Sequence, residues 1–131
     1  MNRFVRVAGL AASLIWLAVD PARAQAQSYW IDIDDPAELR ALHTNKTHKV
    51  VTGSRAEAYY RADGSALFVS EGERTARTWV VQGNDKVCYS GKSFPGCRKF
   101  KRSRSNPSEL HSIHEDGWDV LLKVEDGIPQ F

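Results

Sequence analysis

His111 and His114 are the residues whose types and spacing come closest to a metal site. On a helix, side chains three residues apart share a face, so both imidazoles would reach one zinc or copper ion. The surrounding residues 110–115 favour a strand, on which positions 111 and 114 point to opposite faces. His43 and His48 add two imidazoles, and nothing in the sequence brings them close to this pair. We therefore interpret all four as ordinary sheet or surface histidines and predict neither a metal nor another cofactor. A metal-binding protein or a small metal-dependent enzyme that uses His111 and His114 is the alternative.

A second candidate site is a basic run around Phe100. Five positive side chains fall within seven residues, namely Arg98, Lys99, Lys101, Arg102 and Arg104. Basic residues interleaved with an aromatic residue are typical of surfaces that bind anions. The favoured interpretation is a strand that leads into a solvated loop, whose charges keep a sheet edge from pairing with other chains. The alternative is a patch that binds an anionic lipid headgroup, a glycan or an acidic protein.

The sequence offers no recognisable catalytic motif. It has no Gly-x-Ser-x-Gly elbow, no phosphate-binding glycine loop, and no carboxylates that stand out as an acid and base pair. The only cysteines, Cys88 and Cys97, are expected to form a disulfide because the chain is predicted to be exported. Enzyme activity stays undecided at this point, and a non-catalytic protein is favoured.

Several aromatic side chains stand at alternating positions of predicted strands. Such residues either fill a core or line a cavity inside a barrel, and filling the core is the more frequent role. A cavity would make the protein a lipocalin-like carrier of a small ligand. The residues concerned are Trp79, Trp118, Tyr59, Tyr60 and Phe68.

The first 24 residues have the layout of a secretory signal peptide. Arg3 and Arg6 precede a charge-free run over residues 7–19, and Ala22-Arg23-Ala24 supplies a small-residue cleavage pattern. A run of this length is too short for a hydrocarbon core about 30 Å thick. We therefore expect a periplasmic or secreted protein with no transmembrane segment after cleavage. The leader holds three of the 18 basic and one of the 16 acidic residues, so the rest of the chain is formally neutral. This balance argues against a nucleic-acid-binding protein.

The segment after the leader predicts a lead-in over residues 25–34 and a single β-rich domain over residues 35–131. Asp35 before Pro36 is typical of a helix start, with Asp35 as N-cap and Glu38 as capping-box acid. The helix is expected to end near His43.

From residue 46 onward, short β-like runs alternate with turn residues such as Asp63-Gly64. In the last long run, Val120 and Leu122 alternate with polar residues, as in a half-buried strand. The pattern predicts a mostly β (α+β) fold, an antiparallel meander of about eight short strands that forms a curled sheet or partial barrel, with one short N-terminal helix and one disulfide. The predicted strands cover residues 47–52, 57–61, 66–70, 75–82, 86–90, 97–101, 110–115 and 118–124.

Four short motifs follow one another in a recognisable order. They are Tyr59-Tyr60-Arg61-Ala62-Asp63-Gly64, Thr78-Trp79-Val80-Val81, Val87-Cys88-Tyr89 with a later cysteine, and Gly127-Ile128-Pro129. In this order the chain resembles a family of small exported proteobacterial proteins whose domain has no assigned function. Arg77 and Thr78 stand where such proteins tend to have glycine shortly before the tryptophan. The resemblance implies a β-rich exported module and brings no known catalytic residues.

Together these features predict a small exported periplasmic protein that acts as a non-catalytic binding or accessory module. Its expected partner is an envelope protein or an anionic envelope component. The lipocalin-like carrier and the metal-dependent protein are the alternatives.

Overall fold

The computed structural model describes residues 29–53, 55–92 and 94–129. The predicted signal peptide over residues 1–24 lies outside this part of the chain. No helix among the described residues is long and apolar enough to span a lipid bilayer.

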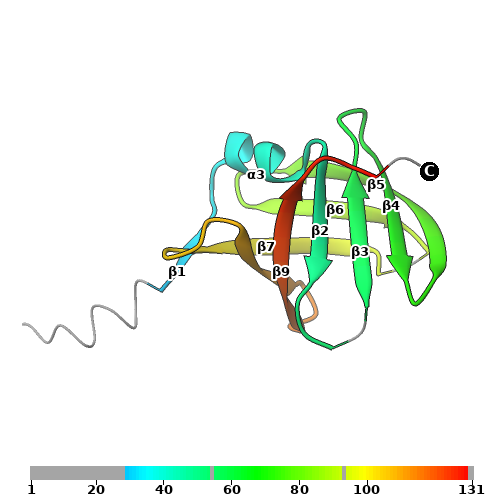
Figure 1. Cartoon of the computed structure of the whole chain (residues 1–131). Helices are drawn as coiled ribbons and strands as arrows, with labels where there is room; N and C mark the ends of the chain where they lie inside the picture. The colour runs from blue at the N-terminus through cyan, green and yellow to red at the C-terminus, as the bar shows by residue number, and fades with distance from the viewer. Residues whose placement is uncertain (1–28, 54, 93, 130–131) are drawn as a thin grey trace, which may run out of the picture.

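Eight antiparallel strands form a closed barrel (Figure 1). Each strand pairs with the next one along the chain, and β9 also pairs with β2, which closes the barrel without a free edge. The fold class predicted from the sequence is confirmed, and each predicted strand corresponds to an observed one. These strands are β2 (Lys46–Val50), β3 (Ala56–Tyr60), β4 (Ser65–Ser70), β5 (Glu73–Gln82), β6 (Lys86–Gly91), β7 (Gly96–Ser103), β8 (Glu109–His114) and β9 (Asp119–Asp126).

A further strand, β1 (Trp30–Asp32), lies within the predicted lead-in segment. It pairs with the second half of β7, in the register Trp30 to Ser103 and Asp32 to Lys101. The next residue, Ile33, is buried, and its N–H donates to the Phe100 carbonyl at 3.0 Å. Three residues are too few to show a period-two pattern, so no local pattern predicts β1.

The predicted helix is α3 (Pro36–His43). Asp35 is its N-cap, and the carboxylate accepts a 3.0 Å bond from the Ala37 N–H, as expected. Glu38 does not show the predicted capping-box role, because its carboxylate accepts two bonds from Arg102 instead. Leu39 is fully buried and packs in the hydrophobic core. The N-cap therefore starts the helix, and the apolar face holds it on the barrel.

The two ends of the barrel differ. Figure 1 shows α3 beside the start of β2, and the β2–β3 connection at the opposite end. Because neighbouring strands run antiparallel, the β4–β5, β6–β7 and β8–β9 connections lie at the same end as β2–β3. We call this end, away from α3, the open end. The fully buried side chains include Leu39 on α3, together with Phe100 and Leu110.

Cys88 and Cys97 form the predicted disulfide. They are directly paired across β6 and β7, with their Cα atoms 4.0 Å apart. The double substitution Cys88→Ser/Cys97→Ser is expected to lower the free energy of unfolding by about 2–3 kcal/mol, since the short covalent loop restricts the unfolded chain. Urea denaturation of both proteins measures this difference. Equal midpoints would show that strand pairing alone holds this hairpin.

Candidate functional site

A cavity of about 380 Å³ lies inside the barrel and reaches the open end. Residues from the β2–β3, β6–β7 and β8–β9 connections contribute to its rim, and inward side chains of the strands form its walls. It is lined by His48, Val50, Thr52, Gly53, Ala56, Glu57, Ala58, Tyr60, Phe68, Ser70, Arg77, Phe94, Arg98, Trp118, Val120 and Leu122. A barrel of eight strands is wide enough to hold one small ligand when side chains do not fill it completely.

Strand periodicity decides which side chains face this cavity. On β5, Arg77 and Trp79 are two residues apart and both point inward, where Arg77 is only 4% exposed. On β7, Arg98 and Phe100 likewise point inward, while Lys99 is exposed. The alternation therefore places two arginines inside the barrel.

Arg77 is held among aromatic rings at the open end. Its Cζ lies 4.8 Å from the ring centroid of Tyr89 and 5.2 Å from that of Phe68. One of its N–H groups, on Nη2, donates to the Phe94 carbonyl at 2.9 Å. Burial lowers the pKa of Arg77, and the charge of Arg98 lowers it further. The guanidinium is thus fixed in a desolvated position beside a second positive charge.

Arg98 contacts the same tyrosine from β7. Its Cζ lies 5.3 Å from the ring centroid of Tyr89 and 4.9 Å from that of Trp118. Ring faces attract a cation, so these contacts compensate part of the lost hydration. They do not supply a countercharge.

Neither arginine forms an ion pair with a carboxylate in the described part of the chain. Arg102 on the same strand differs, because Glu38 lies 3.1 Å from its Nη1. A buried charge without a partner carries a large desolvation penalty. The cavity therefore favours an anion next to Arg77 and Arg98.

Buried polar atoms without a partner concentrate at this cavity. Among the described residues, the side-chain atoms in this state are Nδ1 of His48, Nε of Arg77, Nε of Arg98 and Oγ of Ser112. Three of these four belong to residues that line the cavity. Native structures leave few such atoms, so their clustering marks a place where an additional molecule would complete the hydrogen bonding.

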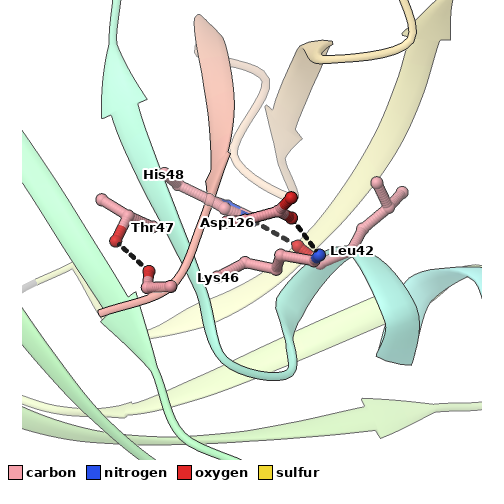
Figure 2. Close-up of polar contacts among 6 residues, drawn as sticks. Leu42, Lys46, Thr47, His48 and Asp126 are labelled. Carbon is pink, nitrogen blue, oxygen red and sulfur yellow. Dashed lines mark hydrogen bonds and ion pairs between the residues drawn. The ribbon is translucent and has the colours of Figure 1, made fainter.

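His48 lies between the cavity and α3. Figure 2 shows its ring bonded to the Leu42 carbonyl, with Nε2–H donating at 2.7 Å. The neighbouring side chains of β2 turn elsewhere: Thr47 donates to the Gly127 carbonyl, and Lys46 pairs with Asp126. Burial lowers the pKa of His48 to about 4, so the ring is neutral at physiological pH.

His43 on α3 packs against His48, with ring centroids 4.6 Å apart. Its Nδ1–H donates to the Leu39 carbonyl, and its Nε2 accepts from the Tyr89 hydroxyl, both at 2.8 Å. Burial and the neighbouring His48 hold the pKa of His43 well below its usual range. His43 has both nitrogens bonded and holds Tyr89 in place, so its role is to position the ring that Arg77 and Arg98 both contact.

Aromatic side chains form the rim of the open end. Phe94 is 53% exposed and Trp118 is 38% exposed, and their ring centroids are 5.9 Å apart. His114 stacks on Trp118 at 4.5 Å, and its Nε2–H donates to the Pro95 carbonyl at 3.1 Å. Gly96 must remain glycine here, because a Cβ at its φ of +117° would lie 2.9 Å from Nε2 of His114. His114 thus fixes the rim on two sides.

The basic run predicted from the sequence does not form one surface. Arg98 lies in the cavity, whereas Lys99 pairs with Asp85, Lys101 with Asp32, and Arg102 with Glu38. The backbone N–H of Arg104 donates to the Tyr29 carbonyl beyond the end of β7. Binding of an anionic surface by this run remains a prediction.

His111 and His114 lie on opposite faces of β8. His111 pairs with Asp119 on the outside of the barrel and contacts Trp30, while His114 points inward. No group of three or more His, Cys, Asp or Glu side chains suited to a metal ion occurs among residues 29–53, 55–92 and 94–129.

The five aromatic residues singled out in the sequence have three different positions. Tyr60, Phe68 and Trp118 line the cavity, Trp79 packs against the core, and the Tyr59 hydroxyl donates to Glu57 on the outer face of β3. Sequence reasoning missed Arg77 and His48 as cavity residues. The spacing of Arg77 from Trp79 carried a usable signal, because inward tryptophan implies inward arginine two positions earlier.

Comparisons with protein-family models, curated proteins and solved structures found no match to this chain. The resemblance to an exported proteobacterial family therefore remains a prediction.

Proposed function

We propose that this protein is a non-catalytic binding module that holds one small anionic ligand inside its barrel. The main support for this proposal is the cavity itself, into which two arginines point that form no ion pair with a carboxylate of the described residues. Its volume of about 380 Å³ is near the lower end of ligand pockets, which suits a small molecule. The proposal unites the carrier and the anion-binding module that the sequence suggested separately.

Electrostatics supports an anion over a neutral ligand. Arg77 and Arg98 both contact the ring of Tyr89, so their charges repel each other across a short distance. A carboxylate, sulfonate or phosphate between them would remove this repulsion and accept charge-assisted hydrogen bonds. The ligand would come from the periplasm or the cell exterior if the chain is exported as the sequence predicts.

The test compares two fluorescent probes with the same aromatic framework. 1-Anilinonaphthalene-8-sulfonate carries a sulfonate, and N-phenyl-1-naphthylamine is its uncharged counterpart. The wild-type protein is expected to bind the sulfonate probe with one-to-one stoichiometry. In the variant Arg77→Gln/Arg98→Gln, the ratio of the affinities for the charged and the neutral probe should fall at least about tenfold, as expected for loss of charge-assisted bonds.

The matched control is Lys99→Gln/Lys101→Gln. It removes two positive charges from the outer side of β7, where both lysines pair with carboxylates. This variant should keep the affinity ratio of the wild type. Near-UV circular dichroism confirms that both variants remain folded. An equal drop in the two variants, or no drop in either, would exclude the cavity as the anion site.

A further inference from the structure

The cavity has polar groups at two separate places along the barrel. Arg77 is bonded to Phe94 and Arg98 contacts Trp118, so both arginines belong to the open end. His48 is bonded to Leu42 of α3, so it belongs to the opposite, closed end. We call the part of the cavity beside Arg77 and Arg98 its mouth, and the part beside His48 its floor.

At the floor, His48 offers an acceptor. Because Nε2 carries the proton that it donates to Leu42, Nδ1 has a free lone pair. Nδ1 is buried and has no hydrogen-bond partner among the described residues, and the whole residue is only 2% exposed. A donor in the ligand would satisfy this nitrogen, and an anionic or purely apolar group there would not.

Five apolar side chains line the cavity on strands that are neighbours around the barrel. Phe68, Ala58 and Val50 lie on β4, β3 and β2, and Leu122 and Val120 lie on β9, which pairs with β2. These side chains offer no hydrogen bonds, so the middle of the ligand is expected to be apolar.

We infer that the ligand is a small molecule with an anionic group at one end, an apolar body, and a hydroxyl or N–H donor at the other end. The anion lies between Arg77 and Arg98, and the donor bonds to Nδ1 of His48. This inference rests on the proposed function and adds the chemical class and the orientation of the ligand. A simple fatty acid does not fit it, because its methyl end would leave Nδ1 buried without a donor.

The experiment uses two pairs of carboxylates that differ in the donor. The first pair is 3-(4-hydroxyphenyl)propanoate and 3-phenylpropanoate, and the second is indole-3-propanoate and its N-methyl analogue. Calorimetric titration of the wild-type protein should show, in at least one pair, that the donor-bearing member binds about tenfold more tightly. Sites built to bond a hydroxyl or N–H reject the analogue that lacks it in this way.

Two further measurements connect the discrimination to His48. In His48→Leu, the two members of the pair should bind with affinities within about twofold, because the acceptor is gone. In the wild-type protein, the ¹⁵N resonance of His48 Nδ1 should shift with the donor-bearing member and stay in place with the other. The second measurement holds even if the leucine variant does not fold.

The outcomes separate this inference from the proposed function. If both members of each pair bind equally and both lose affinity in Arg77→Gln/Arg98→Gln, the anion site stands and the donor inference is overturned. If none of the four carboxylates binds at millimolar concentration although the sulfonate probe does, the inference is also overturned. If the fluorescent probes show no charge preference either, the proposed function itself fails.

Discussion

The free energy of unfolding is expected to fall by about 3 kcal/mol or more as the pH decreases from 7 to 4.5. The reason is the pair of buried histidines between α3 and the cavity. Burial lowers the pKa of His48 to about 4 and holds that of His43 well below its usual range, while an unfolded histidine titrates near 6.5. Above pH 6.5 both states are neutral, and stability is complete. Below pH 6.5 the histidines of the unfolded chain are protonated while those of the folded protein stay neutral, so the free energy of unfolding falls.

The surroundings of the pair reinforce this direction. His48 contacts the rings of His43 and Tyr60, the charge of Arg98 also lowers its pKa, and the described part of the chain offers it no carboxylate partner. Protonation of either ring would therefore add a positive charge to a desolvated region that already holds one.

Chemical denaturation at steps between pH 7 and 4.5 measures this loss above the range in which most carboxylates titrate. His48→Gln should flatten the curve, because one of the two histidines no longer contributes. His111→Gln is the matched control on the outside of β8, and it should keep the steep dependence. A stability that stays constant over this range in the wild-type protein would contradict the assignment of neutral, buried histidines.

The architecture was largely predictable because each strand is marked by a pattern of neighbouring residues in the sequence. Alternating side chains and turns such as Asp63-Gly64 define the eight barrel strands, and Asp35 with Pro36 defines the start of α3. Closure of the barrel depends on pairing between β2 and β9, which are distant in sequence, and no local pattern reports it. The sequence therefore predicted a curled sheet or partial barrel, and the structure shows a closed one.

The site was less predictable, for two different reasons. The charge of Arg98 predicts a place in a surface run, although its alternation with Lys99 assigns the two side chains to opposite faces. The role of His48 depends on the carbonyl of Leu42 and on an Nδ1 that no described residue bonds, which only the packing of α3 against β2 reveals. Alternation can thus place a residue inside a barrel, but it cannot show whether the residue has a partner there.

Truncation of two phenylalanines is expected to destabilise the protein by different amounts at the two ends of the barrel. The loss should be larger at the closed end, beside α3, than at the open end. Phe100 is 2% exposed and lies against His43 and His48, so Phe100→Ala should lower the free energy of unfolding by about 3–5 kcal/mol. Phe68 borders the cavity, where few atoms would lose contacts, so Phe68→Ala should cost about 1–2 kcal/mol.

Urea denaturation of both variants measures the two losses in free energy of unfolding. Phe100→Leu is the control that keeps a large apolar side chain at the closed end. Binding of the sulfonate probe should respond in the opposite order. Phe68→Ala removes a ring whose centroid lies 5.2 Å from Cζ of Arg77, so it should weaken binding of the probe, although it destabilises the fold less than Phe100→Ala does. Equal costs for both truncations would mean that the open end is packed as tightly as the closed end, leaving no room for a ligand. If Phe100→Ala destabilises the fold more and Phe68→Ala weakens binding more, then the closed end of the barrel supplies stability and the open end binds the ligand.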